Sequence, residues 1–209
     1  MPNKEENWNE FEWETAFKRS DRFAHTYFQL LSQYGEFPES SSIIEDRLQK
    51  TYNNLEDFYD SDLILASDSN SFSDEFTDEL SEEEIEQEMT RVSSNPVYTN
   101  LKRCALGWSN ILSSLLKEED KETGLKILYY LGRALATTIC TLSEDAGKAG
   151  NTAFIKRTLF YINACNGLID KLIASREELS QLLNEIKQQF TKIHDLTVDY
   201  LIKTKSAEE

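Results

Sequence analysis

The sequence has few of the residues that shape loop-rich folds. Its 209 residues include only seven glycines and three prolines. An all-β sandwich needs turn residues about every 8–12 positions, so these counts argue against that fold class. The same counts exclude collagen-like and proline-rich chains.

Cysteines and long apolar runs are scarce as well. Cys104, Cys140 and Cys165 have no CxxC spacing and sit among apolar residues at helical spacing, which predicts buried, reduced thiols. Residues 1–14 are polar and acidic, unlike a signal peptide, and no run reaches about 18 uncharged apolar residues. The sequence therefore predicts a cytoplasmic protein with no membrane partner.

The sequence also lacks the motifs of common catalytic sites. It contains no P-loop, no G-x-G-x-x-G, no G-x-S-x-G and no E-x-x-H of the kind that di-iron bundles use. A metal site that joins His25, His194 and a carboxylate is the weaker alternative to two surface histidines. We therefore predict a protein that is not an enzyme, with no catalytic residues, no metal and no cofactor.

What the sequence does have is acidic charge, and that charge is unevenly placed. The formal net charge is −16. Residues 1–100 carry 7 basic and 24 acidic side chains, a net of −17, whereas residues 101–209 carry 15 and 14, a net of +1. This asymmetry indicates an acidic N-terminal half attached to a nearly neutral C-terminal half.

Helical periodicity dominates both halves, and no segment alternates with the period of a strand. In the acidic half it predicts a helix over residues 9–34, stopped by Gly35, and a second over residues 40–58. Residues 60–73 read as a loop rich in Ser and Asp. An acidic helix over residues 73–92 follows, and Ser81 with Glu84 suggests that its well-formed part begins at Glu82. Its narrow apolar stripe predicts that it docks on a core.

In the C-terminal half, Asn95 and Pro96 mark the start of a helix that ends in a polar turn over residues 117–123. The next helix covers residues 125–142, and a glycine loop over residues 147–150 precedes the third. Near Ser175 two alternatives remain open, a new helix or one very long helix. The last segment resembles heptads: Leu179, Ile186, Ile193 and Tyr200 at one position, and Leu182, Gln189 and Leu196 at the other.

These patterns predict an all-α fold, an up-and-down antiparallel four-helix bundle with its core in residues 96–202 and additional N-terminal helices. Residues 1–58 would be aromatic-rich helices that pack on the bundle. Residues 59–94 would be an acidic loop and weak helix, and residues 95–205 the bundle core. We expect the three regions to form one compact domain.

Residues 132–172 carry an acid-and-glycine turn, a hydroxyl residue, a Phe-led helix and a stretch of small residues. The residues concerned are Glu144, Thr152, Phe154, Ala164 and Gly167. This segment resembles small bacterial four-helix-bundle proteins, which include proteins encoded in ribosomal RNA intervening sequences and accessory proteins of diversity-generating retroelements. The resemblance implies a bundle, and an activity through contacts with nucleic acid or reverse transcriptase.

Three groups of residues are candidates for binding. Aromatic anchors for a partner would come from the first helix: Trp8, Phe11 and Trp13, which cannot all face inward on one helix. An acidic docking segment spans residues 74–88, with candidate contacts at Asp74, Glu75, Asp78, Glu79, Glu82, Glu83 and Glu86. A basic face would combine Lys102, Arg103, Lys126, Arg133, Lys148, Lys156 and Arg157.

These groups lead to two hypotheses. The favoured one is a protein-binding or scaffolding role in which the acidic segment docks on a basic protein partner and the aromatic residues anchor it. In the alternative, the basic face binds nucleic acid and the acidic arm covers that face to regulate access. The heptad-like last segment leaves both a monomer and a homodimer open.

Overall fold

The computed structural model describes residues 8–35, 37–52, 82–142 and 147–206. Every regular element in these ranges is helical, which confirms the all-α class. The α-helices are α1 (Glu10–Tyr34), α2 (Ser40–Thr51), α4 (Glu82–Ser94), α5 (Pro96–Ser114), α6 (Glu118–Cys140), α7 (Gly147–Ser175) and α8 (Ser180–Ser206). A 3₁₀ turn, η3 (Glu177–Leu179), joins α7 to α8.

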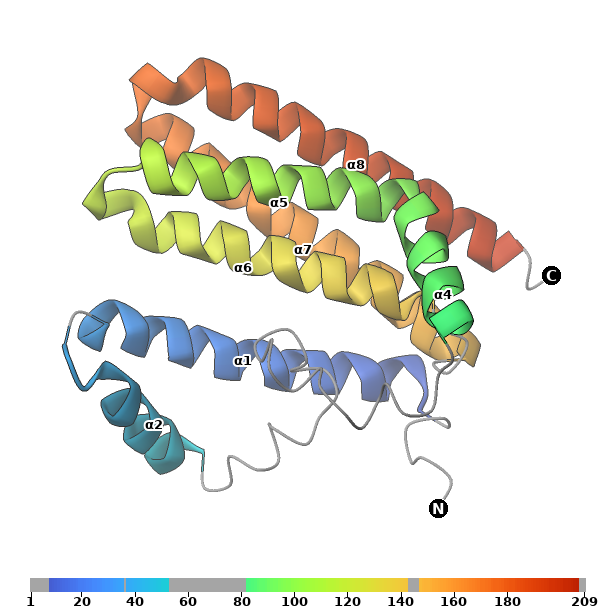
Figure 1. Cartoon of the computed structure of the whole chain (residues 1–209), viewed down its shortest axis with the longest axis horizontal. Coiled ribbons are helices and arrows are strands. Elements are labelled where there is room, and N and C mark those ends of the chain that lie inside the picture. Colours follow the sequence, from blue (N-terminus) through green and yellow to red (C-terminus); the bar gives the residue numbers. More distant parts are fainter. Residues whose placement is uncertain (1–7, 36, 53–81, 143–146, 207–209) are drawn as a thin grey trace.

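Helices α5, α6, α7 and α8 form the four-helix bundle (Figure 1). Each packs against the next along the chain, and α8 returns to pack on α5, which closes the ring. Short connections between antiparallel neighbours produce this up-and-down arrangement, as the sequence predicts. The core is a single apolar cluster. Its largest fully buried members are Trp108, Tyr161, Phe190, Leu101, Ile127, Leu131, Ile162, Ile169 and Leu183.

The helices outside the bundle attach to it in different ways. Helix α1 runs alongside the bundle and packs on α7 and α6, while α2 folds back on α1 (Figure 1). Helix α4 packs against α5 and meets it at a bend at Asn95. The bundle therefore presents α7 and α6 to α1, and one end of α5 to α4.

Several predicted helix ends are confirmed. Asn9 caps α1 in a capping box with Glu12, and the backbone N–H of Gly35 closes the other end on Leu31. The Asn95 side chain accepts hydrogen bonds from the backbone of Val97 and Tyr98 at the start of α5. In each case the side chain satisfies amide groups that the helix itself leaves unpaired.

The two predicted interhelical loops are wrong in position. Helix α6 begins at Glu118, inside the predicted turn over residues 117–123, because three acidic residues suit the first turn of a helix. Helix α7 begins at Gly147, so residues 147–150 are helical despite the low helix propensity of glycine. Tertiary packing outweighs that propensity here, and Gly150 is buried.

The alternatives at Ser175 resolve into two helices. Arg176 leaves the helical conformation, with φ −132° and ψ 78°, and η3 follows before α8. The heptad prediction for α8 is wrong at one position: Gln189 is exposed, while Leu183 and Phe190 are fully buried. A straight helix with 3.6 residues per turn buries positions i, i+4 and i+7, which moves the buried stripe away from a strict heptad.

Candidate functional site

The acidic docking segment lies partly inside the described structure. Asp74, Glu75, Asp78 and Glu79 fall outside the described residues, as does the predicted loop over residues 60–73. The backbone of Glu82 and Glu83 forms the first turn of α4, and the Glu86 side chain is exposed. The described part of the acidic helix covers Glu82–Ser94, and the predicted start with Ser81 lies outside the described residues.

The predicted apolar stripe of α4 is not buried at Met89. Met89 is 68% exposed, whereas Val92 is half-buried near the junction with α5. The sequence of α4 holds five glutamates and one arginine, which favour contact with water over docking on an apolar core. The helix is therefore anchored at its C-terminal end, and its described side chains Glu86 and Met89 are exposed.

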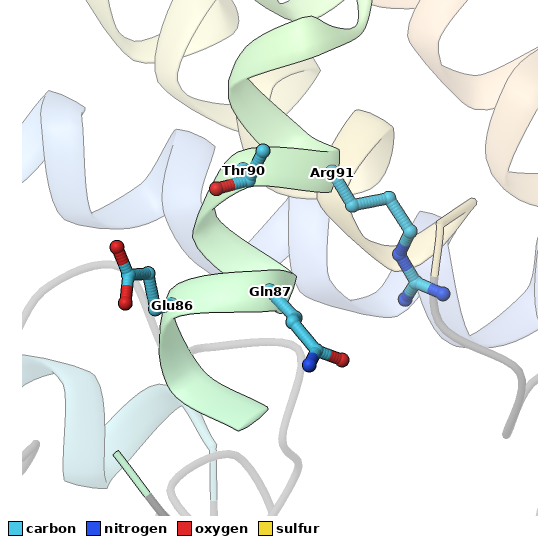
Figure 2. A pocket seen from close by; sticks show the side chains of 4 residues that line it. All are labelled: Glu86, Gln87, Thr90 and Arg91. Atoms are coloured by element: carbon cyan, nitrogen blue, oxygen red, sulfur yellow. The ribbon is translucent and has the colours of Figure 1, made fainter. Parts of the chain in front are cut away.

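A hollow of about 530 Å³ lies beside α4, and Figure 2 shows the side chains that line it. The described lining residues are Glu86, Gln87, Thr90 and Arg91, all from this one helix. In Figure 2 the Glu86 carboxylate and the Arg91 guanidinium project to different sides of the helix. Among the described lining residues, the acid and the base do not converge as a catalytic pair would.

The aromatic anchors differ sharply in exposure. Trp13 is 5% exposed and packs on Phe154, with ring centroids 4.9 Å apart. Trp8 is half-buried and meets Trp13 edge to face at 5.0 Å. Phe11 is 78% exposed. The prediction that the three cannot all face inward is confirmed, and of the three only Phe11 is fully open to a partner.

The predicted basic residues do not form one exposed face in the described structure. Lys102 and Arg103 are exposed on α5, and Lys126 pairs with Glu122 at 2.5 Å on the surface of α6. Arg133 is buried, and its Nε donates to the Tyr161 hydroxyl at 3.3 Å. The side chain of Lys148 lies outside the described part.

The last two basic residues, Lys156 and Arg157, bind α1. Lys156 forms an ion pair with Glu10 on the surface. Arg157 is 3% exposed and pairs with Asp21 and, at 3.4 Å, with Glu14. Its guanidinium also lies 4.2 Å from the centroid of the Phe160 ring, a cation–π distance.

A hydroxyl completes this contact between α1 and α7. The Tyr161 hydroxyl donates a hydrogen bond to Asp21 at 2.9 Å and accepts one from Arg133. Because Asp21 also pairs with Arg157, the hydroxyl and this carboxylate together connect the two arginines. We call Glu14, Asp21, Arg157 and Tyr161 the α1–α7 seam. A cavity of about 250 Å³ beside the seam is lined by Glu10, Glu14, Ala153, Lys156, Arg157 and Phe160. Its acids and bases pair with one another, so this chemistry holds α1 in place.

Arg157 was predicted to belong to an exposed basic face, but it is buried in the seam. The missed signal is its position among Phe154, Phe160 and Tyr161, on an otherwise apolar face of the helix. An arginine there is buried, and a buried charge needs a carboxylate partner. The acidic arm was expected to cover basic bundle residues, and among the described residues α1 contributes those contacts.

The reactive groups of the described part are arranged unlike a catalytic or metal site. Burial raises the pKa values of Cys104, Cys140 and Cys165, which keeps the thiols protonated and unreactive. His25 is exposed, and His194 lies 3.3 Å from Asp195 on the surface. In residues that the structure describes, no three metal-ligating side chains gather in one place.

Comparisons with protein-family models, with curated proteins and with solved structures each find no match. The similarity of residues 132–172 to a four-helix-bundle family therefore stays a prediction. Of the helices that the structure describes, none combines the length and the apolar character needed to cross a bilayer.

Proposed function

We propose that this protein is a non-enzymatic helical-bundle protein that binds a basic surface of another protein through the acidic segment ending in α4. The observation that supports this most directly is the exposure of α4. Met89 is 68% exposed beside the exposed Glu86. A large apolar side chain among carboxylates supplies both an anchor and a charge pattern for a partner.

The use of the other acidic residues supports α4 as the docking surface. Glu10, Glu14 and Asp21 of α1 are engaged with Lys156 and Arg157 of the bundle. The glutamates of α4 instead stand in a helix that holds a single basic residue, Arg91. A concentration of one sign of charge attracts the opposite charge over about a Debye length, roughly 8 Å at physiological salt.

The nucleic-acid alternative has less support from the basic side chains. Arg133 and Arg157 are buried, and Lys156 is paired with Glu10. Phosphate contacts need exposed lysines and arginines on one continuous surface. Of the predicted basic residues, Lys102 and Arg103 are exposed, and their helix, α5, contains no carboxylate.

The test compares two variants that change the net charge by the same amount. E82Q/E83Q/E84Q/E86Q neutralises α4, and E39Q/E45Q/E185Q/D199N neutralises four exposed carboxylates elsewhere. A fluorescent polylysine peptide, followed by anisotropy at low and physiological salt, is the basic probe. We expect the α4 variant to bind about tenfold more weakly, because four exposed pairs contribute about 0.2–1 kcal/mol each.

The control variant should bind the peptide almost as well as the natural chain. Equal weakening in both variants would show that only the overall charge attracts the peptide, and the proposed docking site would be wrong.

A further inference from the structure

The outer face of α5 is open along its whole length. Its residues are all exposed: Thr99, Lys102, Arg103, Leu106, Gly107, Asn110, Ser113 and Ser114. They recur every three or four positions and so form one stripe along the helix. The helix contains no acidic residue, and Lys102 and Arg103 give it a positive charge.

This stripe combines an apolar contact with room for close approach. Leu106 is 62% exposed, a large apolar surface in contact with water. A methyl group added at the neighbouring Gly107 would meet no other atom within 4 Å, so the backbone there is uncovered. Small residues allow another helix to approach closely, as in packed helix pairs.

Helix α4 has the complementary pattern. Its five glutamates oppose the two basic residues of α5 in charge, and Met89 is as open as Leu106. On α4 the exposed Glu86 precedes Met89 by about one turn, and on α5 Lys102 and Arg103 precede Leu106 by about one turn. The charged and apolar parts of the two surfaces thus have the same spacing.

The two helices of one chain cannot pair through these surfaces. They follow each other directly, with Asn95 between them, and Figure 1 shows α4 leaving the end of α5 at a steep angle. The other arginines of the bundle, Arg133, Arg157 and Arg176, are buried and offer α4 no exposed guanidinium. A second molecule can supply the missing surface.

We propose that a second copy of this chain is a partner of α4: the α4 helix of each copy lies on the outer face of α5 in the other. This inference rests on the proposed function, since it names the basic surface that α4 binds. The two contacts are related by a two-fold axis, and each copy gives one acidic and one basic surface. Two equal contacts double the buried area and close the assembly at a dimer.

The high net charge opposes this pairing only at long range. At physiological salt, charges farther apart than about 8 Å are largely screened, whereas contacts between opposite charges remain. The apolar contact of Met89 with Leu106 adds a contribution to the free energy of dimerisation that salt does not weaken. We therefore expect a dimer that forms with rising protein concentration at physiological salt.

Charge reversal tests the pairing with the full chain. K102E/R103E reverses α5, and E82K/E86K reverses α4; sedimentation velocity measures the mass in each case. Each variant alone should dimerise at least about tenfold more weakly than the natural chain, because like charges then face each other. A mixture of the two variants should form a heterodimer, and one chain with all four changes should dimerise again.

A chain that stays monomeric at every concentration, or a dimer that ignores both reversals, would overturn the inference. Failure of the mixture to form a heterodimer would overturn it as well. M89S and L106S serve as variants without a charge change, and both should weaken the dimer. Circular dichroism should show unchanged helix content in all variants, because every altered side chain that the structure describes is exposed.

Binding of polylysine separates this inference from the proposed function. K102E/R103E leaves α4 intact and frees it from the second copy, so this variant should bind the peptide at least as tightly as the natural chain does. A monomeric protein with α4-dependent peptide binding would disprove the dimer and leave the proposed function standing. Binding of a short RNA or DNA that K102E/R103E abolishes, in a monomeric chain, would instead assign the α5 face to nucleic acid and overturn the dimer.

Discussion

Two buried tryptophans show how differently the bundle and the N-terminal helix are held. Trp108 of α5 is 1% exposed, and its indole N–H donates to the carbonyl of Gly124 in α6 at 2.8 Å. Trp13 of α1 is 5% exposed and packs among aromatic rings, but its N–H has no acceptor among the described residues. The indole N–H of Trp108 finds an acceptor within the bundle, whereas the indole N–H of Trp13 does not find one at the described contact with α1.

The other contacts of the bundle and of α1 show the same contrast. The bundle core is a broad apolar cluster contributed by four helices. Helix α1 buries only Trp13, Phe17 and Ser20 over its 25 residues and depends on the ion pairs of the α1–α7 seam. Stability follows buried apolar area and satisfied hydrogen bonds, so α1 should detach at a lower free energy than the bundle unfolds.

The largest expected effect comes from removing the tryptophan of the bundle. W108A deletes a fully buried indole and its hydrogen bond to the Gly124 carbonyl. Large-to-small changes of this kind destabilise by about 3–5 kcal/mol, so the whole chain should unfold at lower urea concentration. Equilibrium urea unfolding, followed by circular dichroism, measures the loss.

W108F separates the two causes, because it keeps most of the ring and removes only the donor. It should cost about 0.5–1.5 kcal/mol, the net contribution of one hydrogen bond, because the Gly124 carbonyl still accepts the backbone bond of its own helix. If W108A unfolded no more readily than the natural chain, the central place of this residue in the bundle would be disproved.

A smaller and more local effect is expected at the α1–α7 seam. R157M keeps an apolar stem but removes the charge that Asp21 and Glu14 face. Breaking a buried ion pair costs several kcal/mol, and the partial exposure of both carboxylates reduces this to about 1–3 kcal/mol. Hydrogen exchange should accelerate in α1, while the amides at the centre of α6 keep their protection.

K156A is the matched control, one residue away on the same helix. Lys156 and Glu10 are 42% and 47% exposed, and exposed pairs contribute about 0–1 kcal/mol. Its exchange profile should therefore stay close to that of the natural chain. Equal acceleration in the two variants would show that burial of Arg157 is unimportant to the seam.

The same contrast explains which parts of the fold could be predicted. Periodicity places Leu131 and Ile162 in the core, because helices adjacent in sequence bury regular stripes against one another. Asn95 could be recognised as a cap, since a cap needs only a short local motif. The start of α6 was missed because a polar first turn resembles a loop.

The seam could not be predicted in the same way. Arg157 meets Asp21 across 136 residues of chain, and no periodicity in a single sequence reports such a pairing. The position of Arg157 among aromatic residues indicates that it needs a carboxylate partner, but it does not identify that carboxylate. The acidic surface of α4 was recognisable from composition, whereas the exposure of Met89 depends on the angle at which α4 leaves α5.

The smallest expected effect is a difference between two thiols of the natural chain. Cys165 lies in the bundle core, and Cys140 packs beside the cluster of Trp13, Phe17 and Phe154. Burial raises the pKa of both thiols above the ordinary value of 9.0, so each reacts only after its surroundings open. Detachment of α1 exposes Cys140 at a lower free energy than the unfolding that exposes Cys165.

We therefore expect a thiol reagent to modify Cys140 before Cys165, with the sites identified by mass spectrometry of peptides. R157M should accelerate modification of Cys140 and leave Cys165 unchanged. The raised pKa values also predict how stability changes with pH. Above about pH 9 the unfolded thiols lose protons that the native thiols keep, so stability falls as the pH rises. Simultaneous modification of both thiols would mean that α1 detaches only when the bundle unfolds, and the contrast between the two tryptophans would have no consequence for stability.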